Sequence, residues 1–74
     1  MAKIDAKSEV TGSVWKILKH AGDTFAEEDV LMIIESMKME IPVIAEAAGK
    51  VLEVSVAEGT SVNEGDTVMV LDLT

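Results

Sequence analysis

The sequence predicts a small all-β domain made of two copies of one structural unit. It has 74 residues, which fits one domain over residues 1–74. Its halves align without a gap at an offset of 37 residues, so that Gly12 aligns with Gly49 and Val14 with Val51. Apolar and polar residues alternate between glycine-containing turns, as in short half-buried strands. Two copies are too few for a solenoid, so we expect the halves to cover each other's apolar faces.

The aligned halves span residues 10–36 and 47–73. In the first half, residues 12–18 alternate as a strand. A turn is expected at residues 20–23, because Gly22 can adopt a positive φ at no steric cost. The corresponding elements of the second half are a strand at residues 49–56 and turns at 57–60 and 64–66.

The next segment of the first half can be interpreted in two ways. Residues 24–27 form a capping-box pattern and residues 28–40 are rich in helix formers, which favours a helix over residues 26–40. The aligned stretch of the second half contains Gly65 and several β-branched residues, which a helix resists. If the two copies share one fold, residues 31–35 form a strand, as does the matching segment that ends at Asp72.

The two copies differ after these strands, because only the first continues into another apolar segment, at residues 41–45. Pro42 cannot donate a backbone hydrogen bond, so this strand should begin there or lie at a sheet edge. Two strands joined by a few residues form a hairpin, which we expect over residues 35–41. It is the main difference between the copies and therefore the candidate functional element.

Lys38 stands at or near the tip of this hairpin, between Met37 and Met39. A lysine in a turn is usually a solvated charge, and methionines are usually core filling. Residue type alone therefore does not assign a role to this segment.

Composition excludes several classes of function. Fourteen acidic residues against six lysines give a formal net charge of -8, which disfavours nucleic acid and anionic membranes as partners. The longest apolar run is residues 30–34, and residues 1–5 contain no apolar segment of a secretory signal, so we expect a soluble, cytoplasmic protein. One histidine and no cysteine, arginine or tyrosine argue against an independent enzyme. The acidic surface favours a monomer.

No metal site is predicted. The carboxylates of residues 27–29 would alternate between the two faces of a strand, so a solvated turn is expected there. His20 has no second histidine or cysteine to complete a zinc site, and its position suits a turn. Trp15 could be either a partly exposed aromatic residue or an anchor in the core.

The segment Glu-Ser-Met-Lys-Met-Glu, followed by Ile-Pro-Val, resembles the attachment motif of the biotinyl domain family. The resemblance covers about Val10 to Leu73 and is strongest to small stand-alone biotin/lipoyl attachment proteins of bacteria. It implies a flattened barrel, or hammerhead, of two four-stranded antiparallel sheets related by a pseudo-two-fold axis. It also implies that Lys38 carries biotin and that Met37 and Met39 help a ligase to recognise the hairpin.

The same resemblance implies a carrier rather than an enzyme. Biotin protein ligase would join biotin to Lys38, and a biotin carboxylase and a carboxyltransferase would then use the attached group. Glu35 and Glu40 are candidate contacts for partners of the hairpin. The family often has a second glycine where this chain has Glu28, so we expect another turn geometry there.

Two alternatives stay open. Lipoyl domains share the fold but usually have Asp-Lys-Ala at the attachment site, so Lys38 could carry lipoate, although Met37 and Met39 favour biotin. The chain could also be an unmodified β-barrel module whose hairpin docks to a protein partner.

Overall fold

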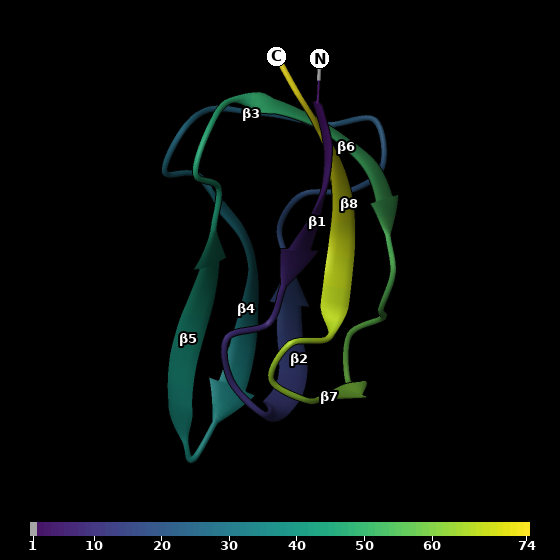
Figure 1. Cartoon of the computed structure of the whole chain (residues 1–74). Coiled ribbons are helices and arrows are strands. Elements are labelled where there is room, and N and C mark those ends of the chain that lie inside the picture. Colours follow the sequence, from purple (N-terminus) through teal and green to yellow (C-terminus); the bar gives the residue numbers. More distant parts are fainter. Residues whose placement is uncertain (1) are drawn as a thin grey trace.

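The computed structural model describes residues 2–74, and within this range it contains eight strands and no helix (Figure 1). The all-β prediction is confirmed. None of these residues belongs to a helix that could cross a membrane. The strands are β1 (Ala2–Lys7), β2 (Gly12–Ile17), β3 (Thr24–Phe25), β4 (Val30–Ser36), β5 (Met39–Ile44), β6 (Gly49–Val54), β7 (Ser61–Val62) and β8 (Thr67–Leu73).

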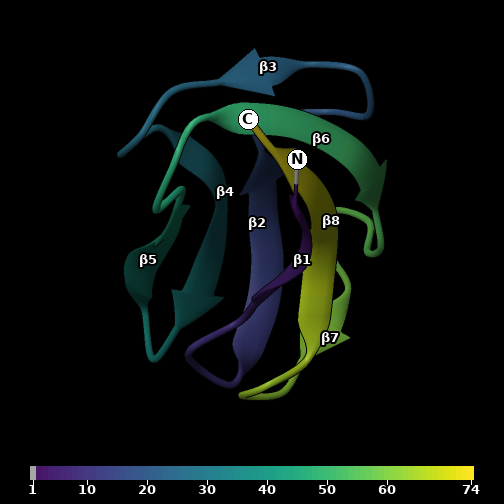
Figure 2. The same cartoon turned by 45° about the horizontal axis from the view of Figure 1, so that its top comes forward.

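The strands form two four-stranded antiparallel sheets, as expected. The first sheet has the strand order β1-β8-β6-β3, and the second has the order β5-β4-β2-β7. The sheets enclose one hydrophobic core and together make a flattened barrel of 35 × 18 × 17 Å (Figure 2). The turn between β4 and β5 lies at the opposite end of the molecule from the N- and C-terminal ends (Figure 1).

The internal repeat holds for every strand, since β1 to β4 correspond to β5 to β8 at the same offset of 37 residues. The pairing is repeated as well: Ala2 lies opposite Leu73 in β1 and β8, and Met39 lies opposite Ser36 in β5 and β4. The repeat therefore extends beyond the halves that the sequence alignment outlined. Strand β5 is the counterpart of β1, not an addition to the first copy, and the β4–β5 hairpin joins the two halves.

The core is built from equivalent residues of the two copies. Its one buried polar side chain among the described residues is Ser8, whose hydroxyl donates to the Val10 carbonyl at 2.6 Å and is thereby satisfied. The equivalent position in the second copy is the buried Ala45. The buried apolar pairs are Val14 with Val51, Phe25 with Val62, Leu31 with Val68, Met32 with Met69, and Ile34 with Leu71.

The strand interpretation of residues 31–35 is confirmed, and the helix over residues 26–40 is wrong. This segment lies in β4, which pairs with both β2 and β5, so the pairing with its neighbours overrides the local preference for a helix. Strand β5 is the outer strand of its sheet, which places Pro42 at an edge as predicted, although the strand begins at Met39.

The expectation of a different turn geometry at Glu28 is wrong. Glu28 has a φ of 74°, close to the 90° of its counterpart Gly65. The Glu28 amide donates to the Ala45 carbonyl at 2.8 Å, and the Gly65 amide donates to the Ser8 carbonyl at 2.8 Å. These matching bonds hold Glu28 in the left-handed region, despite a steric cost of roughly 1 kcal/mol.

Candidate functional site

The candidate site is the two-residue turn of the β4–β5 hairpin. Ser36 and Met39 form the last pair of the ladder, so Met37 and Lys38 alone make the connection. The structure thus places Lys38 at the tip of the hairpin, as the sequence predicts. Strand β4 is also paired with β2 on its other side, which supports the base of the hairpin.

Both residues of this turn have a left-handed backbone. The φ angle is 52° at Met37 and 64° at Lys38. Positive φ at both central positions is the pattern of a type I′ turn, which normally uses asparagine and glycine because they adopt it readily. A methionine and a lysine adopt this backbone only at a steric cost. Their presence in the turn therefore indicates that the side chains serve a function, because backbone preference would favour other residues.

Replacing Met37 by Asn together with Lys38 by Gly should raise the free energy of unfolding by about 1–2 kcal/mol, because these residues relieve the backbone strain. Equilibrium denaturation in urea measures the change. Met37→Ala is the control: the Met37 side chain is 92% exposed, so its loss should leave stability nearly unchanged. A double variant no more stable than the wild type would show that the turn carries no strain.

The side chains of the turn project into solvent. Lys38 is exposed, Met37 is 92% exposed and Met39 is 62% exposed. Within residues 2–74, no ion pair engages the Lys38 amine. The site therefore offers an accessible primary amine between two flexible apolar side chains. This arrangement suits covalent modification by an enzyme that binds the hairpin.

Two acidic residues stand directly behind the turn. Glu35 and Glu40 lie opposite each other in β4 and β5. Like charges at such a position destabilise a sheet. At the equivalent place in the other sheet, Asp72 instead pairs with Lys3 on one side and with Lys50 on the other. The hairpin thus has two acidic residues opposite each other, where the equivalent position of the other sheet has a carboxylate opposite two lysines.

Contacts with Thr11 and with Gly12, the first residue of β2, fix the base of the hairpin. The Ser36 hydroxyl donates to the Thr11 carbonyl at 2.8 Å. Gly12 lies so close to β4 that a Cβ atom there would collide with the Glu35 carbonyl oxygen. The sequence identified Gly12 only as a member of the repeat, and no local pattern indicated the contact between Ser36 and Thr11.

Other residues considered from the sequence lie away from this site. His20 occupies a turn, where its imidazole Nδ1 is 3.8 Å from the Asp23 carboxylate. Residues 27 and 28 also lie in a turn, and residues 2–74 contain no cluster of three or more side chains suited to bind a metal ion. Trp15 is 44% exposed beside a register shift in β2, so it is a partly exposed residue and not a core anchor.

Comparison with known proteins adds independent information about the chain. Residues 5–71 match a family model described as biotin-requiring enzyme. A biotinylated protein TB7.3 homolog of Mycobacterium leprae is 43% identical over 67 residues, which are 90% of this chain and 94% of that protein. A biotin/lipoyl attachment protein of Bacillus subtilis is 44% identical over 63 residues, which are 85% of this chain and 86% of that protein.

Two solved structures contain a very similar fold. The urea carboxylase of Kluyveromyces lactis matches with a TM-score of 0.90 and 36% identity, over 97% of this chain and 6% of that chain. A single-chain, multi-domain long-chain acyl-CoA carboxylase matches with a TM-score of 0.91 and 25% identity, over 97% of this chain and 7% of that chain. The present chain therefore spans a small fraction of the length of either carboxylase.

Proposed function

The chain belongs to the biotin/lipoyl attachment family, and on this premise we propose that it is a carrier domain that biotin protein ligase modifies on Lys38. The observation that carries the proposal is the position of Lys38, exposed in a strained two-residue turn between Met37 and Met39. The family match over residues 5–71 supports one attachment domain over residues 1–74.

The attachment reaction requires an enzyme. A lysine amine is mostly protonated at neutral pH, so the ligase must remove a proton before the amine can attack. The Lys38 nitrogen then forms an amide bond with the carboxyl carbon of biotinyl-adenylate, and the bond from that carbon to AMP breaks. AMP leaves, the nitrogen gives up a second proton as the amide forms, and the carrier has lost one positive charge. Apart from the Lys38 amine itself, no side chain of this domain has to give or take a proton in the reaction.

Biotin, once attached, supplies a ring that can carry a carboxyl group. Lys38 then acts as a flexible arm between a biotin carboxylase and a carboxyltransferase, which we propose as partners. The similarity of the fold to parts of two carboxylases supports these partners. The barrel holds both ends of the hairpin in register, so it presents the arm in a constant direction.

We assign ligase recognition to Met37 and Met39, because both are exposed and flank the acceptor. Glu35 and Glu40 attract basic surfaces of the ligase and of later partners, and this attraction should weaken as salt rises. This role of the two glutamates would be contradicted if the rate of ligation did not change with ionic strength in either the wild type or Glu40→Gln.

The purified chain should accept biotin from biotin protein ligase and ATP, and should accept little lipoate from a lipoate ligase under matched conditions. Intact mass spectrometry identifies the adduct, and the initial rate measures the preference. Changing Met37 to Asp together with Met39 to Ala should lower the rate of biotin ligation about tenfold or more, because recognition residues dominate such interfaces.

Leu52→Ala is the matched control, since Leu52 is an exposed apolar residue outside the hairpin and its loss should leave the rate unchanged. An equal fall in both variants would overturn the role of the methionines. Efficient lipoylation without biotinylation would identify the chain as an acyl carrier. Modification by neither ligase, with control domains modified, would favour an unmodified interaction module.

A further inference from the structure

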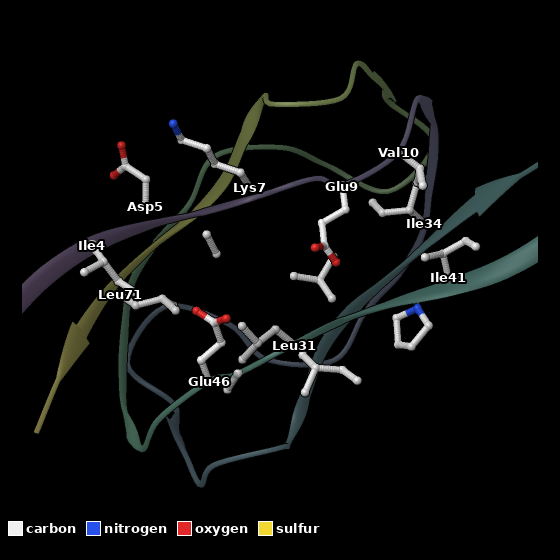
Figure 3. Close-up of a pocket in the computed structure, with 15 residues that line it drawn as sticks. Ile4, Asp5, Lys7, Glu9, Val10, Leu31, Ile34, Ile41, Glu46 and Leu71 are labelled. Carbon is white, nitrogen blue, oxygen red and sulfur yellow. The ribbon is translucent and has the colours of Figure 1, made fainter.

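A cleft of about 300 Å³ lies between the edge strands β1 and β5 (Figure 3). Ile4 of β1 and its counterpart Ile41 of β5 line its two sides. Leu31, Ile34 and Leu71 also line it, and each is at most 3% exposed. The cleft thus has an apolar floor and lies where the two halves of the repeat meet.

Two carboxylates enter this cleft from opposite sides. Glu9 follows β1 and Glu46 follows β5, at equivalent positions of the repeat. Both side chains point into the cleft, whereas the amine of Lys7 points away from them (Figure 3). The carboxylate of Asp5 also points away from the two glutamates (Figure 3). A cationic group between the two glutamates is therefore attracted, and an anion is repelled.

The strands beside the cleft also have free backbone edges. Among the described residues, β1 pairs only with β8 and β5 pairs only with β4. An edge strand presents N–H and C=O groups to which an extended peptide can add. Pro42 lacks an N–H group and interrupts the edge of β5, whereas β1 contains no proline. Strand β1 is therefore the better edge for such an addition.

We infer that the cleft binds an extended segment of a partner protein in which arginine or lysine alternates with apolar residues. The segment adds to the edge of β1, and one basic side chain reaches between Glu9 and Glu46 while its aliphatic stem lies against the partly buried apolar side chains of the lining, such as Ile4 and Ile41. A purely apolar segment fits less well, because it would cover two carboxylates without giving them hydrogen-bond donors. This surface is distinct from the hairpin and does not depend on modification of Lys38.

Titration of the isotope-labelled chain with a short, end-capped peptide of alternating valine and arginine tests the inference. We expect chemical-shift changes in the amides of β1 and of residues Glu9 and Glu46, together with slower amide hydrogen exchange along β1. The comparison peptide carries citrulline in place of arginine, which keeps the length of the side chain and removes its charge. It should bind at least about tenfold more weakly.

Glu9→Gln and Glu46→Gln should each raise the Kd of the arginine peptide about tenfold, because each removes a charged acceptor. Glu53→Gln makes the same change of charge on β6, outside the cleft, and should leave the Kd unchanged. Lys38→Arg should bind the peptide normally, which separates this surface from the attachment site. Equal binding of the citrulline peptide, unchanged affinity in Glu9→Gln, or shifts confined to the hairpin would overturn the inference.

Discussion

Replacing Lys38 by arginine is expected to abolish biotin incorporation and to leave the fold intact. The guanidinium group stays protonated and is a poor nucleophile, so the ligase cannot form the amide bond. The change keeps a long, positively charged side chain at an exposed turn position, which makes little contribution to stability. Mass spectrometry after incubation with ligase, biotin and ATP measures the loss.

The other five lysines of the chain provide the internal control, because they remain available in the variant. Lys50 is informative, since it is an exposed residue of β6, in the sheet that does not contain the hairpin. Lys50→Arg should be biotinylated at the rate of the wild type. Full labelling of Lys38→Arg, or loss of labelling in Lys50→Arg, would contradict the assignment of the acceptor.

Gly12→Ala is expected to lower the free energy of unfolding by about 2–3 kcal/mol, which is at the upper end for overpacking in a small domain. A Cβ atom at this position would collide with the Glu35 carbonyl oxygen and would approach Ile34 Cγ2 to 3.2 Å. The carbonyl belongs to the backbone of β4, so the clash can be relieved only by moving that strand away from β2. Denaturation in urea gives the change in stability.

The repeat supplies a second test of the same contact. A Cβ atom at Gly49 would collide with the Asp72 carbonyl oxygen, so Gly49→Ala should destabilise the chain by a comparable amount. Glu53→Ala, at an exposed position of β6, should have little effect. If both glycine variants are as stable as the wild type, the close approach of the strands does not constrain the fold.

Much of the fold follows from the comparison of the two halves. Residues 26–40 taken alone favour a helix, and it is the aligned segment, with Gly65 and its β-branched residues, that identifies β4 as a strand. Strand β1 escaped this comparison, because among its aligned positions only Ile4 has an identical counterpart, Ile41. Its place in the sheet depends on pairing with β8, which local sequence does not encode.

The turn at Glu28 could not be predicted for a different reason. Local preference argues against a positive φ for glutamate, but the bond from its amide to the Ala45 carbonyl fixes that backbone. At the hairpin, the sequence placed Lys38 near the tip, whereas the strain at Met37 and Lys38 required the structure. The cleft between Glu9 and Glu46 likewise depends on bringing together two halves that lie apart in sequence.

The most direct test of the proposed function is the intact mass of the chain purified from cells with active biotin and lipoate ligases, followed by peptide mapping. We expect one biotinyl adduct, located on the peptide that contains Lys38. A lipoyl adduct, a biotinyl adduct on another lysine, or an unmodified chain from cells that modify control domains would contradict it.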